Sequence, residues 1–430
     1  MVRLDARDSG FAADFEALVN ARREADEDVS RDVAAIIARV RTEGDAAVAG
    51  LTRRFDGHDL DWKIDLADCR AAYEALDTDL RNALDLAAER IRTYHAKQKP
   101  ENSDMVDSAG VRVGARWTAV DAAGVYVPGG RAAYPSSVLM NAIPAKVAGV
   151  ERLVMVTPTP KGEINRLVLA AAHIAGVDEV WRVGGAQAVA ALAFGTATIG
   201  KVDVVTGPGN AWVAEAKRQL YGMVGIDMVA GPSEILVVAD GQNDPQWIAA
   251  DLLSQAEHDP TSQSILITDD AAFADAVAAA VDSQIAELAT GATARTSWDA
   301  NGAILIVADL MDAVPLIDAL APEHLELAVE DPEPLFAAVR HAGSIFLGRH
   351  TPEAVGDYVG GPNHVLPTGR RARFSSGLSV LDFMKRTSFL GCSPDAIRAI
   401  GPAAVALARA EGLPAHALSL IHIGRCRRRG

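Results

Sequence analysis

A repeated alternation of short apolar segments with alanine-rich segments constrains this chain more than any other feature. The apolar segments fall into two series, which lie at about 147–160, 179–185 and 202–208, and then at 234–240, 262–270, 302–310 and 343–348. Apolar residues fill each segment without alternating, as is typical of parallel strands that are covered by helices on both faces. The sequence therefore predicts an α/β fold with two consecutive three-layer α/β domains and mainly parallel sheets.

The regions before and after these two series have a different residue pattern. Helical periodicity dominates residues 1 to about 100, and glycine turns between 111 and 127 indicate short strands or a hairpin. We predict an N-terminal helical region with short strands at 1–119, a first α/β domain at 120–232, a second at 233–375, a small C-terminal tail domain at 376–417 and a non-native tail at 418–430.

Length, charge and cysteine content narrow the class of protein. A chain of 430 residues is too long for one compact core. Its formal charge of −16 argues against nucleic acids and anionic membranes as partners. Neither a membrane-spanning apolar run nor a signal-peptide pattern is present in the sequence, and Cys69, Cys392 and Cys426 form no disulfide or metal-binding pattern. We expect a cytoplasmic protein.

The last thirteen residues, 418–430, change abruptly to a basic composition without periodicity. They resemble the translation of a sequencing adapter that has been fused to a gene fragment, although a genuine basic tail is the alternative. Without the four arginines of this segment the formal charge is −20. We leave the segment out of the fold prediction.

Four loops combine glycine or proline with a polar side chain at the ends of predicted elements. They lie at 127–130, 184–187, 207–210 and 231–234. Ligands of parallel α/β sheets bind beyond the carboxyl ends of strands, and helix N-termini favour phosphate. Each loop can equally be an ordinary turn, and none contains the GxGxxG dinucleotide motif. The four together predict a ligand site.

Gln255 and His258 form half of a predicted metal site. Asp244 and Pro245 predict a helix start, and Pro260 stops the helix, so Gln255 and His258 fall in its last turn on the same side. An amide oxygen and an imidazole are both metal ligands. The alternative interpretation is the polar end of a surface helix.

Further titratable groups follow this helix in the sequence. Glu323 and His324 come directly after a proline, where one could act on water and the other on a substrate hydroxyl; a capped helix start is the alternative. Asp357 and His364 lie in a Gly/Pro-rich loop, and Glu411 and His416 add another acid and imidazole near the end. One Gln, one Asp and two His are plausible mixed ligands for zinc, and the HExxH motif of zinc proteases is absent.

Several strings together carry a resemblance to a known family. They include GVYVPGGRAAYPSSVLMNAIPAKVAGV, VGGAQAVAALAFGT, GPGNAWVAEAKRQLYG, DMVAGPSEILVVAD, DLLSQAEHDP, APEHLEL, YVGGPNHVLPT and ARFSSGLSVLDFMK. From about residue 20 to His416 the chain resembles histidinol dehydrogenases. The resemblance implies an aldehyde-dehydrogenase-like α/β fold. It also implies oxidation of L-histidinol through L-histidinaldehyde to L-histidine in the last step of histidine biosynthesis, with NAD as the oxidant.

The resemblance also assigns roles to residues. It implies one Zn²⁺ per subunit with the ligands Gln255, His258, Asp357 and His416. His324 matches the general base for the alcohol, and Glu323 matches the residue that activates water. The implied substrate-binding residues are Ser233, Gln255, His258, His324, Asp357, His364, Glu411 and His416, and the implied NAD contacts are Tyr126, Gln187 and Asn210.

Members of the family are homodimers that share active sites through the C-terminal segment, so 376–417 is a predicted dimerisation tail, and Glu411 and His416 would serve the other subunit. Because the tail replaces residues that follow His416 in the family, we expect weakened zinc binding. A related zinc dehydrogenase acting on another primary alcohol, such as a sulfonated diol, is the main alternative, and a non-catalytic two-domain binding protein is the second. A thiol-based aldehyde dehydrogenase is disfavoured because Cys69 and Cys392 have no activating base nearby in the sequence.

Overall fold

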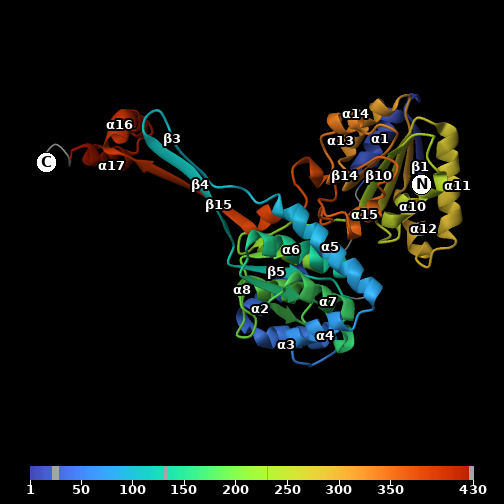
Figure 1. Ribbon diagram of the computed structural model, residues 1–430, viewed down its shortest axis with the longest axis horizontal. Coiled ribbons are helices and arrows are strands. Elements are labelled where there is room, and N and C mark those ends of the chain that lie inside the picture. Colours follow the sequence, from blue (N-terminus) through green and yellow to red (C-terminus); the bar gives the residue numbers. More distant parts are fainter. Residues whose placement is uncertain (22–28, 130–133, 230, 426–430) are drawn as a thin grey trace. The chain divides into compact units, whose positions relative to one another are not determined.

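The computed structural model describes residues 1–21, 29–129, 134–229 and 231–425 (Figure 1). Gly130 of the predicted loop at 127–130 and residues 426–430 of the predicted tail lie outside the described residues. The chain divides into two compact units. The first consists of Met1–Gln98 and Asp121–Phe383, and the second of Lys99–Val120 and Met384–Gly430.

The first unit contains two six-stranded sheets. The strand order of the first sheet is β2-β7-β6-β5-β8-β9. Its strands are β2 (Lys63–Ile64), β5 (Ala122–Tyr126), β6 (Arg152–Val156), β7 (Glu179–Trp181), β8 (Val204–Thr206) and β9 (Gly225–Ile226). Only the edge strand β2 pairs antiparallel among these six described strands. A right-handed crossover helix therefore has to follow most of the strands.

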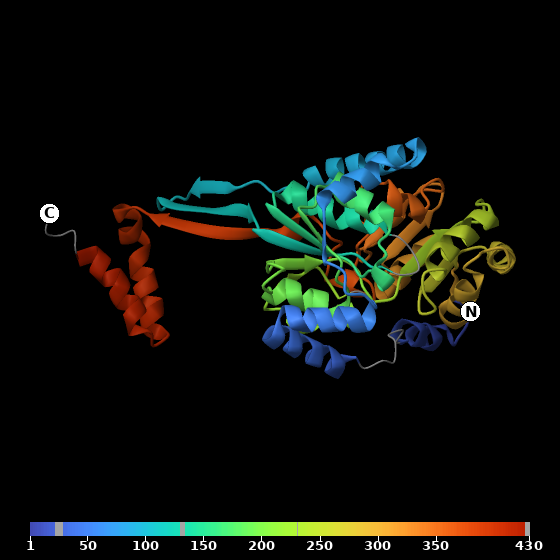
Figure 2. The same ribbon diagram turned by 90° about the horizontal axis from the view of Figure 1, so that it is seen from below.

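Helices cover both faces of the first sheet. One layer consists of α2 (Ser30–Glu43), α3 (Asp45–Phe55), α8 (Gly185–Phe194) and α9 (Ala211–Leu220), which contact one another. The other consists of α4 (Leu66–Glu74), α5 (Thr78–Ala96), α6 (Pro135–Ala148) and α7 (Arg166–Ala175). In Figure 2 the dark blue helices α2 and α3 lie on one side of this sheet and the lighter blue α5 on the other. The two layers bury the apolar strands, as the sequence predicts.

The second sheet is wholly parallel, with the strand order β1-β12-β11-β10-β13-β14. Its strands are β1 (Val2–Asp5), β10 (Glu234–Ala239), β11 (Gln263–Thr268), β12 (Ala303–Ile306), β13 (His324–Ala328) and β14 (Ser344–Leu347). Apolar side chains of β10 to β13 alternate between two core clusters, one on each face of the sheet. On β13, Leu325 and Leu327 belong to one cluster, so His324 and Glu326 point to the opposite face.

The helices α10 (Pro245–Ala256), α11 (Ala271–Ile285) and α12 (Gly291–Asn301) cover the face that His324 and Glu326 share. The other face is covered by α1 (Phe11–Asn20), α13 (Ala313–Leu320) and α14 (Glu333–Ala338). The short helix α15 (Glu353–Tyr358) packs against α10. The remaining elements of this unit are 3-10 turns at η1 (Pro160–Gly162), η2 (Leu310–Asp312), η3 (Arg371–Arg373) and η4 (Val380–Phe383).

The second unit is a three-stranded antiparallel sheet with two helices. Its strand order is β15-β4-β3, formed by β15 (Met384–Cys392), β4 (Val111–Ala119) and β3 (Ser103–Val106). The helices α16 (Pro394–Ala410) and α17 (Pro414–Arg425) pack against each other. The nine-residue pairing of β15 with β4 joins segments more than 260 residues apart in the chain.

The predicted α/β class with mainly parallel sheets is confirmed, and one local prediction, the placement of His258 in the last turn of its helix, needs correction. The N-terminal region also supplies β1, which pairs with β12 because its Val2 and Leu4 extend the second sheet. The segment that starts at His324 is a strand, so the alternative interpretation of a capped helix start does not hold. Helix α10 ends at Ala256, so His258 lies in the following turn and not in the last helical turn. Asp244 caps α10 as predicted, because its side chain accepts a hydrogen bond from the Gln246 N–H.

A buried ion pair between Lys217 and Asp227 holds the loop after β8. Lys217 Nζ donates to the Gly207 carbonyl at 2.9 Å, and Asp227 Oδ2 accepts from the Gly207 N–H at 2.8 Å. Gly207 has φ of 112°, and a Cβ there would lie 2.1 Å from the Tyr126 carbonyl oxygen. The ion pair therefore fixes a close approach of the loop after β8 to the end of β5 that only glycine permits.

Asp227→Asn should destabilise the first unit by about 3–5 kcal/mol, because it leaves the Lys217 charge buried without its partner. The free energy of unfolding in urea at neutral pH measures the effect. Asp275→Asn is the matched control, since it breaks the exposed pair with Arg3 and should cost less than about 1 kcal/mol. Equal losses in the two variants would contradict the prediction.

Among the helices that the structure describes, we find none with both the length and the apolar character needed to cross a membrane.

Candidate active site

A cavity of about 400 Å³ in the first unit collects most of the predicted site residues. Its lining includes Ser233, Gln255, His258, Glu323, His324, Asp357 and His364. Pro128, Gly207 and Gly209 reach it from loops that follow strands of the first sheet, as predicted. The second sheet contributes residues from the amino ends of its strands, because Ser233 precedes β10 and His324 is the first residue of β13. The prediction that the site lies at the carboxyl ends of strands therefore holds for the first sheet only.

Gln255, His258 and Asp357 line the same cavity, although His258 and Asp357 are 99 positions apart in the sequence. The Gln255 side chain is only 1% exposed, and its Nε2 has no hydrogen-bond partner among the described residues. Burial opposes ionisation of Asp357, but the His364 ring, with Nδ1 at 3.5 Å from Oδ1, lowers its pKa to about 2. Asp357 is therefore a carboxylate at neutral pH.

Glu323 lies in the bend that leads into β13. Ala321 ends α13 in the left-handed conformation with φ of 43°, and Pro322 then directs the chain into the strand. Glu323 Oε2 accepts a hydrogen bond from the Glu234 N–H at 3.0 Å, and the Glu323 N–H donates to Glu234 Oε2 at 3.3 Å. Burial, reinforced by the negative charge of Glu234, raises the pKa of Glu323 to about 8. A carboxyl group with a pKa near neutrality is suited to proton transfer.

His324 is held with one ring nitrogen free. Its Nδ1 donates to the Glu234 carbonyl oxygen at 2.9 Å, so the neutral ring carries its lone pair on Nε2. Nε2 is buried and has no hydrogen-bond partner among the described residues. Burial opposes a charge on the ring, but the carboxyl groups of Glu323 and Glu353 outweigh it and raise the pKa of His324. This ring can accept a proton through Nε2.

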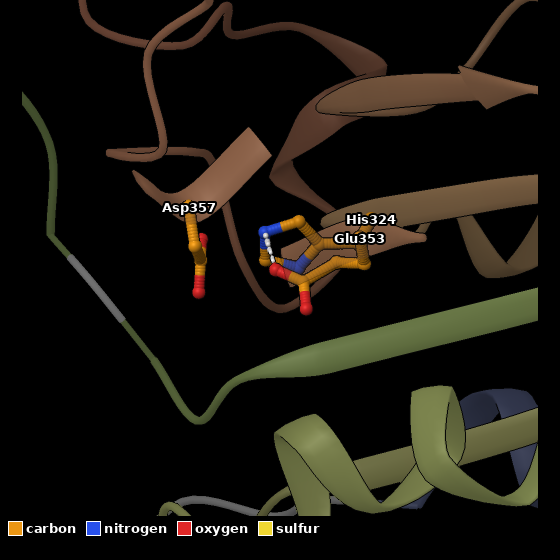
Figure 3. Close-up of side chains that lie close together, drawn as sticks. All are labelled: His324, Glu353 and Asp357. Carbon is orange, nitrogen blue, oxygen red and sulfur yellow. Dashed lines mark ion pairs between the residues drawn. The ribbon is translucent and has the colours of Figure 1, made fainter. Parts of the chain in front are cut away.

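Glu353 is a site residue that the sequence analysis missed. It is the first residue of α15, is 1% exposed, and its Oε1 lies 3.5 Å from His324 Nε2. Ligand atoms of His324, Glu353 and Asp357 all lie within 4.8 Å of one another, so the three could hold a metal ion (Figure 3). A signal was available, because Glu353 stands four residues before Asp357 and shares its helix face.

A second acid pair consists of half-buried Asp251 on α10 and buried Glu326 on β13. Burial and the neighbouring Asp251 raise the pKa of Glu326 to about 9, and burial raises the pKa of Asp251 to about 6. The two carboxyl groups are hydrogen-bonded and share one proton. The pair therefore holds one proton between its two carboxyl groups at neutral pH.

The predicted NAD contacts lie at the carboxyl edge of the first sheet. Tyr126 ends β5, and its hydroxyl accepts a hydrogen bond from the Gly185 N–H at 3.0 Å. Gln187 is buried in the first turn of α8, and Asn210 caps α9 through a hydrogen bond from the Val213 N–H at 3.2 Å. These three residues do not line the cavity. Pro128 and Gly207, in the loops that follow β5 and β8, do line it.

The other two predicted residues belong to the second unit. Glu411 follows the last residue of α16, and His416 lies in the first turn of α17. Both side chains are exposed.

A family model for histidinol dehydrogenase matches residues 19–422. The chain belongs to the histidinol dehydrogenase family. It is 65% identical over 424 residues to a histidinol dehydrogenase of Zymomonas mobilis, with 98% of this chain and 99% of the relative covered. The histidinol dehydrogenase of Rhodospirillum rubrum is 62% identical, with 97% and 98% covered.

Solved structures agree with this membership. The crystal structure of histidinol dehydrogenase from Elizabethkingia anophelis superimposes with a TM-score of 0.94 at 34% identity, and 98% of each chain is covered. The resemblance inferred from the sequence is thus confirmed. As a member of the histidinol dehydrogenase family the chain is an oxidoreductase enzyme, and its cavity unites two candidate proton-transfer groups, Glu323 and His324, with candidate metal ligands.

Proposed function

We propose that this enzyme oxidises L-histidinol through L-histidinaldehyde to L-histidine, using Zn²⁺ and two molecules of NAD. The observation that carries the proposal is the convergence of seven residues of the family's pattern on one cavity, from segments that span Ser233 to His364. Family membership over nearly the whole chain supports histidinol as the substrate.

The donor set in the cavity fits zinc. Gln255 is buried in the cavity lining with an amide nitrogen that has no hydrogen-bond partner among the described residues, and Asp357 is ionised. An amide oxygen, a carboxylate and the His258 imidazole form a mixed N/O set that suits Zn²⁺, and the fourth ligand in this proposal is His416. When bound, zinc would hold the imidazole and amino nitrogens of the substrate and so fix its orientation.

The edge of the first sheet fits NAD. Helix α8 starts at Gly185, whose N–H donates to the Tyr126 hydroxyl, and the N-cap residue Gly184 provides no side-chain cap. The N-terminus of such a helix favours a diphosphate. In this proposal Tyr126, Gln187 and Asn210 contact the coenzyme there. When bound, NAD supplies the hydride acceptor for both oxidations.

Two residues of the chain, His324 and Glu323, carry out the proton transfers in this proposal. His324 Nε2 takes the hydroxyl proton of the alcohol, because hydride leaves carbon only as the hydroxyl is deprotonated. Glu323 takes a proton from the water that adds to the aldehyde in the second oxidation. Ser233, His364 and Glu411 contact the substrate, and binding through the remote imidazole limits escape of the aldehyde between the two steps.

We also propose a homodimer in which Glu411 and His416 complete the partner's site, so residues 376–417 serve dimerisation. Large exposed apolar side chains in the second unit support this. Met105, Leu390 and Leu407 are 59%, 69% and 65% exposed, which is costly for apolar groups left in water. The use of NAD, an intracellular coenzyme, leads us to place the enzyme in the cytoplasm.

Chelation should abolish NADH formation from L-histidinol, and added Zn²⁺ should restore it. The loss should exceed about 10-fold, because substrate orientation depends on the metal. Metal content measured beside the rate checks that zinc follows activity. Full activity in metal-free enzyme would contradict the proposal, and NADH formation from a sulfonated diol but not from histidinol would favour the alternative substrate class.

A further inference from the structure

We propose that Asn363 is a positioning residue, whose side-chain amide holds the loop 359–368 against helices α5 and α6 and so fixes His364 in the wall of the cavity. This inference deepens the proposed function and rests on it, because His364 is there a substrate contact. In the sequence Asn363 simply precedes His364, and no motif gives it a role. Its role follows from contacts with residues that are far away in the chain.

The described residues 359–368 follow α15 and form no helix or strand. The hydrogen bonds of regular secondary structure therefore do not fix this loop. His364, Val365 and Leu366 belong to it and line the cavity. Side-chain hydrogen bonds to the loop, and from the loop to neighbouring elements, have to keep these lining residues in place.

The Asn363 side chain provides such hydrogen bonds from a buried position. Its Oδ1 accepts from the Val365 N–H at 2.9 Å, and its Nδ2 donates to the Met140 carbonyl oxygen at 2.6 Å. Nδ2 also lies 3.3 Å from His95 Nε2. Met140 is on α6 and His95 is on α5, so one amide group connects the loop to two helices that pack against each other (Figure 1).

The His95 ring is an acceptor for this amide. Its Nδ1 lies 2.8 Å from the Ile91 carbonyl oxygen, one turn earlier on α5, and carries a hydrogen in order to donate there. The neutral ring then has its lone pair on Nε2, which faces Asn363 Nδ2. Burial lowers the pKa of His95 and so favours this neutral form. Each polar atom of the buried Asn363 amide thus meets a group of the opposite kind.

Helix α5 also holds the first part of the same loop. The Arg90 guanidinium donates to the carbonyl oxygen of Val359 and, at 3.2 Å, to that of Gly360. Gly361 has φ of 107°, and a Cβ there would lie 3.1 Å from the Arg90 carbonyl oxygen. The loop therefore runs close along α5 from Val359 to Asn363.

These contacts fix two walls of the cavity relative to each other. Helix α6 lines the cavity with Ser136 and Ser137, about one turn before Met140. The loop lines it with His364, directly after Asn363. The hydrogen bond from Asn363 to Met140 joins the two walls. Without it the loop can shift away from α6, and a displacement of about 1 Å is enough to weaken a directed contact with a substrate.

Asn363→Ala in the zinc-loaded enzyme tests the inference. KM for L-histidinol should rise about 5- to 20-fold, because the substrate loses a well-placed partner in the ground state and in the transition state alike. We expect kcat to change by less than about 3-fold. KM for NAD and the zinc content should stay at parent values, since Asp357 lies on α15, which packs against α10. Steady-state NADH formation and metal analysis of the same sample measure these quantities.

Asn243→Ala is the matched control for the loss of a buried amide. Asn243 is 8% exposed, and its Nδ2 donates to the Ala328 carbonyl oxygen at 2.6 Å, the distance found between Asn363 and Met140. It is not among the described residues that line the cavity. Both variants should unfold at a lower urea concentration than the parent enzyme, but KM for L-histidinol should rise only in Asn363→Ala.

A parent KM in Asn363→Ala overturns the inference, whatever the loss of stability, and so does an equal rise of KM in Asn243→Ala. If Asn363→Ala does not fold, Asn363→Ser decides. Its hydroxyl can still accept from the Val365 N–H, but it is too short to reach the Met140 carbonyl oxygen as well. A parent KM in Asn363→Ser then overturns the inference.

His364→Ala separates this inference from the proposed function. A raised KM for L-histidinol in His364→Ala, together with a parent KM in Asn363→Ala, refutes only the role of Asn363. A parent KM in His364→Ala refutes the proposed substrate contact itself.

Discussion

Glu323→Gln should yield an enzyme that forms one NADH per L-histidinol and accumulates L-histidinaldehyde. The amide fits the same space and can still accept the hydrogen bond from the Glu234 N–H, but it cannot take a proton from water. The second oxidation should slow by about 10²- to 10⁴-fold, while the first changes by less than about 3-fold. Separate assays with L-histidinol and with L-histidinaldehyde as the starting substrate measure the two steps.

The pH dependence of the aldehyde step provides a sharper readout of the same substitution. Burial raises the pKa of Glu323 to about 8, so the group is largely protonated below that pH and ionised above it. Because only the carboxylate can take a proton from water, the rate of the parent enzyme should rise as the pH increases through about 8. The rise should be absent in Glu323→Gln. Glu330→Gln, which removes an exposed carboxylate paired with Arg349, should keep the parent profile. L-Histidine formation at the parent rate by Glu323→Gln would sink the assignment.

His324→Asn should lose the first oxidation, with kcat from L-histidinol reduced by about 10²- to 10⁴-fold. Asparagine can keep a donor near the Glu234 carbonyl oxygen, but it lacks the basic nitrogen that corresponds to Nε2. Because the base acts only as the hydroxyl loses its proton, KM should change little. Initial NADH formation at saturating substrate measures the effect.

Deuterium on the reacting carbon of L-histidinol adds an independent measurement for this variant. The isotope effect on kcat should become larger in His324→Asn than in the parent enzyme, because hydride transfer then limits turnover. His341→Asn is the matched control, since it removes an imidazole outside the residues that line the cavity, and it should keep parent kinetics. An unchanged kcat in His324→Asn would show that another group takes the proton.

Local sequence patterns predicted those parts of the fold that local interactions form. Asp244 and Pro245 specify the start of α10 through a cap and a fixed φ, and the apolar runs specify strands that are buried on both faces. The β15–β4 pairing and the position of β1 beside β12 have no local signal, because they join segments hundreds of residues apart. The segment at His324 is short and polar at its start, so its strand character came from the neighbours β10 and β14.

By itself, the sequence determined the α/β class, the family and most of the candidate site residues, because spacing, turn chemistry and long specific strings are properties of the chain in order. The tertiary structure decided where those residues meet and which further groups join them. It placed Ser233 and His324 at the amino edge of the second sheet and set Glu353 beside the ring. It also shifted the pKa of Glu323 towards neutrality. Burial and the field of neighbouring charges depend on groups far apart in the sequence, and only folding brings them within a few ångströms of each other.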